Sequence, residues 1–202
     1  MQHRNLLLAV LAVAALSGFS VSALAAPIVL TDTCGPAVPA GDGPGPGGTC
    51  VTGILNLDIG GVLFNVDIEV ASGADLFGDA TNPSPVPYFW GDRAGASAAV
   101  SAIVAALNDV GGIVGATGSA GSRYWIDVPW GSAGSDLAVE FADGPFYGDP
   151  WFNAGSGQCG FSPPDCSEEG WALFTVVPEP GTVLLLGGGL MGIAVHGRKR
   201  RV

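Results

Sequence analysis

The central part of this 202-residue sequence lacks histidine and lysine altogether. The two histidines, His3 and His196, and the single lysine, Lys199, all lie in the end segments. Without histidine, this part of the chain cannot form a Ser-His-Asp triad, a Cys-His pair or a histidine-bound zinc site. Without lysine it cannot form a Schiff base. The aspartic-protease motifs Asp-Thr-Gly and Asp-Ser-Gly are also absent. The hydrolase mechanisms that remain use carboxylates alone, chiefly in glycoside hydrolysis.

Positive charge is equally scarce between the two ends. Residues 26–175 contain 17 acidic residues but only two basic ones, Arg93 and Arg123, so the net charge of this region is −15. Such a surface repels nucleic-acid phosphates and anionic polymers unless cations mediate the contact. We therefore expect no nucleic-acid partner.

The hydrophobic run near the N-terminus is too short for an ordinary membrane-spanning helix, which needs roughly 20 residues. This run, Leu6–Leu16, follows Arg4 and precedes Ala23-Leu24-Ala25, a small-x-small cleavage site. The order is that of a secretory signal peptide, so residues 1–25 are predicted to be removed by signal peptidase. An uncleaved membrane anchor is the alternative.

A second short run, Thr182–Val195, separates Pro178-Glu179-Pro180 from a basic end, residues 198–201. To cross a bilayer of about 30 Å, its helix must draw in the adjoining residues, which predicts a single transmembrane segment at 181–197. The basic end then stays cytoplasmic. A helix this short and glycine-rich suits temporary retention before cleavage, as in lipid-anchor attachment.

The segment Val177–Val202 closely resembles the PEP-CTERM sorting signal of Gram-negative bacteria. The sorting motif and the basic stop comprise Val177, Pro178, Glu179 and Pro180, and Arg198, Lys199, Arg200 and Arg201. The resemblance implies processing by an exosortase, a membrane-embedded cysteine transpeptidase that cuts near the motif. It also implies export, transient inner-membrane anchoring and a final place at the cell surface or in the biofilm matrix, with exopolysaccharide as a partner. Residues 176–202 would form this tail, and the resemblance says nothing about activity.

The four cysteines lie in the predicted exported domain, residues 26–175. An even count in an oxidising compartment predicts two disulfides. Three connectivities are possible, and Cys34–Cys50 with Cys159–Cys166 is favoured because each pair closes a local loop. The spacings are not those of a short CxxC metal site.

A β-hairpin is the clearest element of this domain. Apolar residues alternate over Leu55–Ile59 and Val62–Val70, on either side of Gly60-Gly61. A two-residue turn predicts three facing pairs, Ile59 with Val62, Leu57 with Phe64 and Leu55 with Val66. The opposite face then holds the polar side chains of Asn56, Asp58, Asn65, Asp67 and Glu69.

One alanine-rich helix is predicted to follow, with Asp92 as its N-cap. Its apolar positions recur at helical spacing, at Ala96, Ala99, Val100, Ile103, Val104 and Leu107. Asn108 and Gly111-Gly112 are expected to end it. Further strands are predicted at Arg123–Val128, Leu137–Phe141 and Trp171–Val176. This order of strands and helix indicates an α+β domain, in which one helix packs across an antiparallel sheet.

Three sets of side chains are candidates for function. Trp90, Trp130 and Trp151 could stack on sugar rings from loops, with burial in the core as the alternative. A weak calcium site could use acidic residues of the hairpin (Asp58, Asp67 and Glu69) or those that flank a later turn (Asp143 and Asp149). The alternative is a solvated acidic face. A carboxylate pair for glycoside hydrolysis could come from Glu140, Asp143, Glu168 and Glu169, although nothing in the sequence identifies the pair.

We therefore predict an exported, exosortase-processed protein that acts by interaction and is not an enzyme. The first alternative is a glycan-binding module that uses its loop tryptophans. The second is a carboxylate-only glycosidase. No cofactor is expected beyond weakly bound calcium.

Overall fold

The computed structural model describes residues 26–35, 47–118, 121–144, 150–159 and 169–178. All of these except Pro178 belong to one compact unit, Ala26–Val177. Within them the chain forms nine strands and two helices: β1 (Ile28–Thr33), β2 (Thr49–Ile59), β3 (Val62–Ala71), α2 (Gly73–Phe77), α3 (Arg93–Val110), β4 (Ile113–Gly118), β5 (Gly121–Arg123), β6 (Trp125–Ala133), β7 (Asp136–Asp143), β8 (Phe152–Cys159) and β9 (Glu169–Val176). The predicted signal peptide and transmembrane segment lie outside the described residues.

The nine strands make one sheet in the order β5-β4-β2-β3-β9-β6-β7-β8, and β1 also pairs with β2. Most neighbours are antiparallel, as predicted, but β2 pairs with β4 and β6 pairs with β9 in parallel. The predicted antiparallel sheet is therefore confirmed for most strand pairs but not for these two. The reason is topological, because β9 is inserted between β3 and β6. It runs antiparallel to β3 over eight residue pairs and parallel to β6.

The β2–β3 hairpin has the predicted turn but not the whole predicted register. Ile59 faces Val62 and Leu57 faces Phe64, whereas Val66 faces Ile54 in place of Leu55. A bulge between Ile54 and Leu57 causes the shift, and Asn56 within it has a positive φ of 56°. Because the extra residue reverses the alternation, Ile54 takes the buried position and Leu55 is only half-buried.

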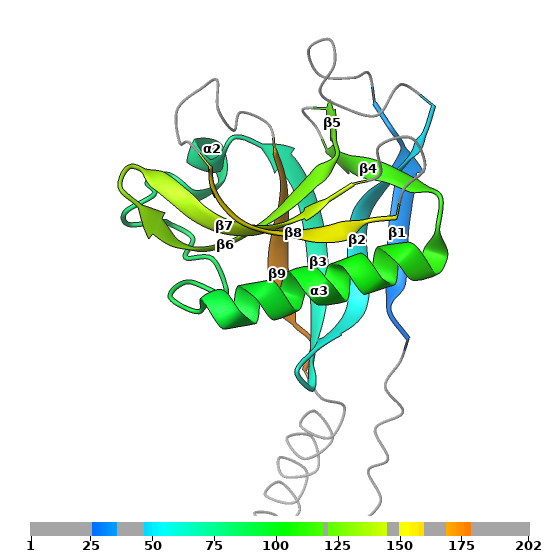
Figure 1. Cartoon of the computed structure of the whole chain (residues 1–202), viewed down its shortest axis with the longest axis horizontal. Helices are drawn as coiled ribbons and strands as arrows, with labels where there is room; N and C mark the ends of the chain where they lie inside the picture. Colours follow the sequence, from blue (N-terminus) through cyan, green and yellow to red (C-terminus); the bar gives the residue numbers. More distant parts are fainter. Residues whose placement is uncertain (1–25, 36–46, 119–120, 145–149, 160–168, 179–202) are drawn as a thin grey trace, which may run out of the picture. The chain divides into compact units, whose positions relative to one another are not determined.

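Helix α3 packs across one face of the sheet, as Figure 1 shows. The predicted N-cap is confirmed, because Oδ1 of Asp92 accepts a hydrogen bond from the Gly95 backbone N–H at 2.9 Å. The helix ends at Gly111, whose φ of 68° suits glycine. Asn108 does not end it, but lies in the last turn and exchanges two 2.9 Å hydrogen bonds with the Trp151 backbone.

The core beneath α3 contains apolar side chains from both halves of the sheet. Alanines on the helix allow close approach, and the longer Val100, Ile103 and Leu107 are fully buried. Val104, expected on this face, is partly buried at its margin. The predicted alanine-rich packing face is thus confirmed.

A smaller apolar cluster covers the opposite face of β7 and β9. It consists of Phe77, Ala80, Leu137, Val139, Cys159 and Trp171. The Trp171 ring meets Phe77 edge to face with centroids 5.5 Å apart, and its Nε1–H donates to the Ala71 carbonyl at 2.9 Å. Strands β7 and β9 are therefore covered on both faces.

The disulfide Cys34–Cys50 is present, as predicted, and closes the loop between β1 and β2. Cys159, at the end of β8, is also disulfide-bonded. Its predicted partner, Cys166, lies outside the described residues.

Candidate functional site

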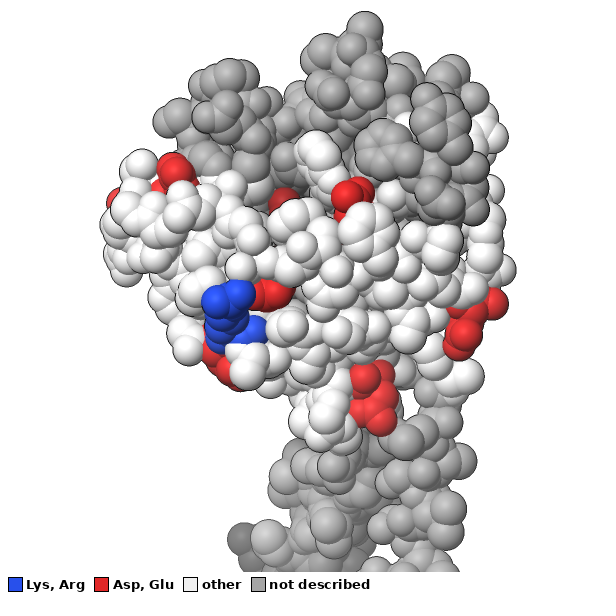
Figure 2. All heavy atoms as spheres, in the orientation of Figure 1, with Lys and Arg blue, Asp and Glu red and all other residues white. Residues whose placement is uncertain are grey.

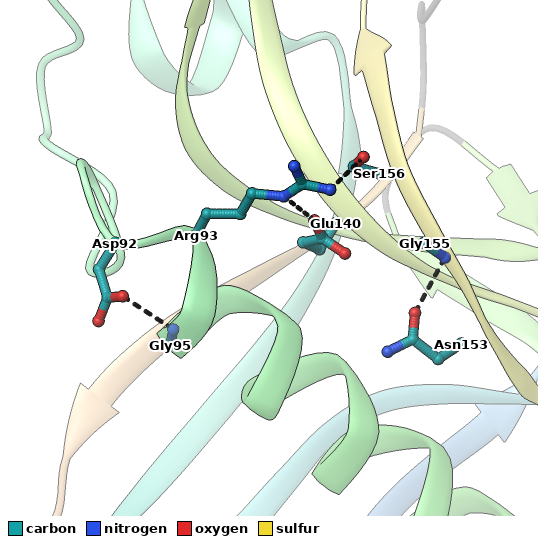
Figure 3. Close-up of polar contacts among 7 residues, drawn as sticks. All are labelled: Asp92, Arg93, Gly95, Glu140, Asn153, Gly155 and Ser156. Carbon is teal, nitrogen blue, oxygen red and sulfur yellow. Dashed lines mark hydrogen bonds and ion pairs between the residues drawn. The ribbon is translucent and has the colours of Figure 1, made fainter.

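The first residue of α3, Arg93, forms the most elaborate polar cluster in the described part of the chain. Its side chain is 58% exposed and extends from the helix to β7 and β8. Its Nε donates to Oε1 of Glu140 at 2.8 Å, and its Nη2 donates to Oγ of Ser156 at 2.6 Å (Figure 3). The Asp92 cap fixes the start of the helix and so helps to fix the base of this side chain.

Glu140 and Trp130 are the more buried residues that the Arg93 side chain contacts. Glu140 is only 3% exposed and lies on β7 directly opposite Ser156 of β8. The guanidinium carbon of Arg93 stands 5.5 Å from the Trp130 ring centroid, within cation–π range. A carboxylate this buried requires a charged partner, and Arg93 supplies it. The guanidinium is consequently held on three sides.

Exposed polar side chains extend the cluster along β8. Asn153 donates through Nδ2 to Oγ of Ser101 on α3 at 3.2 Å. Its Oδ1 accepts from the Gly155 backbone N–H at 2.9 Å, as Figure 3 shows. Farther along the strand, Gln158 is also exposed. We call Arg93, Glu140, Asn153 and Ser156 the polar platform. In Figure 2, the blue basic atoms at the start of α3 lie beside red acidic atoms.

The three tryptophans predicted to contact glycan occupy different environments. Trp151 is 3% exposed and its Nε1–H donates to the Ile113 carbonyl, which places it in the core, the alternative considered above. Trp130 is half-buried beneath Arg93, and its Nε1 has no hydrogen-bond partner. Trp90 is half-buried against the smaller cluster. Trp130 and Trp90 thus pack against different apolar clusters, although the Gly91 backbone N–H donates to the Trp130 carbonyl at 2.7 Å.

The carboxylates suggested for glycoside hydrolysis are also separated. Glu140 and Asp143 are three residues apart on β7, so their side chains project to opposite faces. Burial raises the pKa of Asp143, while hydrogen bonds from Trp125 and the Gly144 backbone oppose that rise. One of its oxygens, Oδ1, is buried without a hydrogen-bond partner. Glu168 and the side chain of Glu169 lie outside the described part of the structure.

The predicted calcium ligands of the hairpin stay apart from any cluster. Asp58, Asp67 and Glu69 are exposed, and Oδ1 of Asp58 accepts from the Gly61 backbone N–H at 2.7 Å in the turn. Among the described residues, no group of three or more His, Cys, Asp or Glu side chains is placed to hold a metal ion. Asp149 falls outside those residues.

The chain leaves β9 directly into the predicted sorting motif. The Val177 backbone N–H donates to the Leu63 carbonyl at 2.8 Å, which continues the pairing of β9 with β3 by one residue. Pro178 is the last described residue; Glu179, Pro180 and the basic residues 198–201 are beyond the described range. No helix in the described ranges is long and apolar enough to cross a membrane.

Comparison with known proteins classifies the tail. Residues 176–201 match the family described as the PEP-CTERM protein-sorting motif. The match implies export with a membrane-anchored sorting signal and is consistent with an exosortase substrate. No curated protein and no solved structure matches the chain.

Sequence reasoning did not select the polar platform. The available signal was the scarcity of positive charge, since Arg93 is one of only two basic residues between positions 26 and 175. Ser156 and Asn153 lie in a glycine-rich stretch without apolar alternation, so β8 was not predicted as a strand.

Proposed function

We propose that this protein is processed by an exosortase and then associates with exopolysaccharide at the cell surface or in the biofilm matrix, acting by binding and not by catalysis. The match of residues 176–201 to the PEP-CTERM sorting motif carries the proposal. The Cys34–Cys50 disulfide supports an oxidising destination.

A glycan-binding activity of the folded domain is the mechanism that we favour for this association. Its support is the polar platform, where Arg93 is fixed by Glu140, Ser156 and Trp130 and remains 58% exposed. Fixed polar groups of both hydrogen-bonding types are what recognition of sugar hydroxyls requires. The separation of Glu140 from Asp143 favours binding over carboxylate-pair hydrolysis.

Substitution of the motif tests the sorting step. Glu179→Ala combined with Pro180→Ala should leave the full-length protein in the inner membrane, while the parent is released in a form that has lost residue 202. Cell fractionation followed by intact-mass measurement distinguishes the two. Asp67→Ala, an exposed substitution on β3, is the matched control and should be processed like the parent.

Equal release of the motif variant and the parent would refute exosortase-dependent sorting. Association with polysaccharide is tested separately, by whether the released parent sediments with purified matrix polysaccharide. Its absence from that pellet would remove the matrix part of the proposal and leave the sorting part intact.

A further inference from the structure

We propose that the polar platform binds the hydroxyl groups of an uncharged polysaccharide, with the guanidinium of Arg93 as its principal hydrogen-bond donor. This inference rests on the proposed function, because it names the site and the ligand class of the same association. The platform combines a buried carboxylate, an exposed guanidinium and a row of exposed polar side chains on one strand.

The guanidinium is both fixed and available. A guanidinium has five N–H donors in a rigid plane. The bonds to Glu140 and Ser156 involve Nε and Nη2, and in Figure 3 the remaining nitrogen of Arg93 points away from both partners. Contact with the Trp130 ring restrains the plane further. An arginine held in this way presents oriented donors with little rotamer entropy left to lose on binding.

The charge around the platform favours a ligand without charge. Glu140 offsets the positive charge of Arg93, and Asp92 is its neighbour in the chain. The surrounding region, residues 26–175, has a net charge of −15. An anionic polymer would approach against this field, whereas a neutral one is not repelled. Hydroxyl groups both donate and accept, and the guanidinium donors together with the Ser156 and Asn153 side chains complement them.

The shape of the platform favours a polymer over a single sugar. Asn153, Ser156 and Gln158 are all exposed along β8, at one end of the sheet order. Because β8 has a bulge, Asn153 and Gln158 pair with Ala142 and Ala138, four residues apart on β7, and at about 3.3 Å per residue the row extends over roughly 13 Å. That length exceeds one hexose ring, so several consecutive sugar units could lie along the strand.

The test measures polysaccharide affinity of the full-length chain, purified in detergent, by electrophoresis through gels that contain a polysaccharide. Dextran, hydroxyethyl cellulose and galactomannan are the uncharged probes, and alginate is the anionic one. Arg93→Lys keeps a positive charge beside Glu140 but removes the planar fork, and should weaken binding about tenfold, which is the scale of one hydrogen bond to a charged group. The double variant Asn153→Ala with Ser156→Ala should also bind more weakly.

Thermal melting followed by circular dichroism verifies that each variant is folded. Asp67→Ala is the control, because it removes an exposed carboxylate on the β2–β3 hairpin and not in the polar platform. The inference predicts retardation by at least one uncharged polymer at low and high salt, with loss in both platform variants and none in the control.

The other outcomes separate the inference from the proposed function. If an uncharged polymer binds all variants equally, the polar platform is not the site, although polysaccharide association stands. If only alginate binds and salt abolishes the effect, the uncharged ligand class is wrong. If the parent binds none of the four polymers, this inference fails; sedimentation with matrix polysaccharide and the fractionation experiment still decide the proposed function.

Discussion

Two parts of one sheet differ in how many of their faces are covered. In the β2–β3 hairpin, which we call the open hairpin, one face packs beneath α3 and the other shows Asp58, Asp67 and Glu69 to solvent. In β7 and β9, the covered strands, the core beneath α3 packs on one face and the smaller apolar cluster on the other. Burial alternates clearly along β3, whereas four successive residues of β7, from Leu137 to Glu140, are buried.

The difference determines what an acidic residue can do at each place. A carboxylate on the open hairpin stays hydrated and affects mainly the surface charge. On the covered strands a carboxylate loses its water and must find another partner. Glu140 finds Arg93, and through that ion pair the start of α3 is joined to the sheet. Because both faces of β7 are covered, Glu140 is buried and pairs with Arg93, and this ion pair is the centre of the polar platform.

Removal of the Trp171 ring should destabilise the covered strands more than any other change considered, because this ring covers the second face of β9. Trp171→Ala deletes a side chain that is 0% exposed and its hydrogen bond to Ala71. We expect the free energy of unfolding to fall by about 3–5 kcal/mol, as for other buried tryptophans. Urea denaturation measures the change. Tyr88→Ala, at a side chain that is 52% exposed, is the control and should cost much less; equal losses would contradict the account of the second face.

Loss of the Arg93 partner should have an intermediate effect. Arg93→Ala leaves the buried Glu140 without its ion pair, so we expect a loss of about 1–3 kcal/mol in the free energy of unfolding. Asp67→Ala on the open hairpin should change stability by no more than about 0.5 kcal/mol. Both values come from urea denaturation at neutral pH. The explanation fails if the two substitutions have the same effect.

The smallest expected effect concerns pH and Asp143, at the end of β7. Burial raises its pKa in the folded state above the value of 3.8, so the folded protein holds this proton more tightly than the unfolded chain. The resulting stabilisation is present below pH 3.8 and is lost as pH rises through the folded pKa. Relative to the parent, Asp143→Asn should therefore gain stability as pH rises through this window. Thermal melting across acidic and neutral pH tests the sign, and a constant difference would contradict it.

The open hairpin was the more predictable part of the fold. Its alternation and Gly-Gly turn predicted both strands and two of the three tested residue pairs, Ile59 with Val62 and Leu57 with Phe64. The predicted pairing of Leu55 with Val66 was wrong because Asn56 adopts a positive φ. Asparagine tolerates this conformation, but its presence in a sequence does not predict it. Helix α3 was also predictable, since its cap and its spaced apolar positions are local signals.

Long-range features were less predictable. The parallel pairing of β9 with β6 joins residues more than 40 positions apart and leaves no local pattern. Strand β8 pairs with β7 through its backbone, and its glycine-rich sequence has no alternation of apolar residues that would predict a strand. The polar platform depends on these same long-range pairings, because Arg93 meets Glu140 47 positions away. The sorting tail, whose signal is contiguous in sequence, was by contrast recognisable without the fold.

The position of β9 has a consequence for timing during export. β9 lies inside the sheet, between β3 and β6, so the sheet is incomplete until β9 is in place. A chain that crosses a membrane N-terminus first delivers β9 last among the strands described. The sorting motif follows within two residues of Val176. Completion of the sheet and arrival of the sorting motif are therefore nearly the same event.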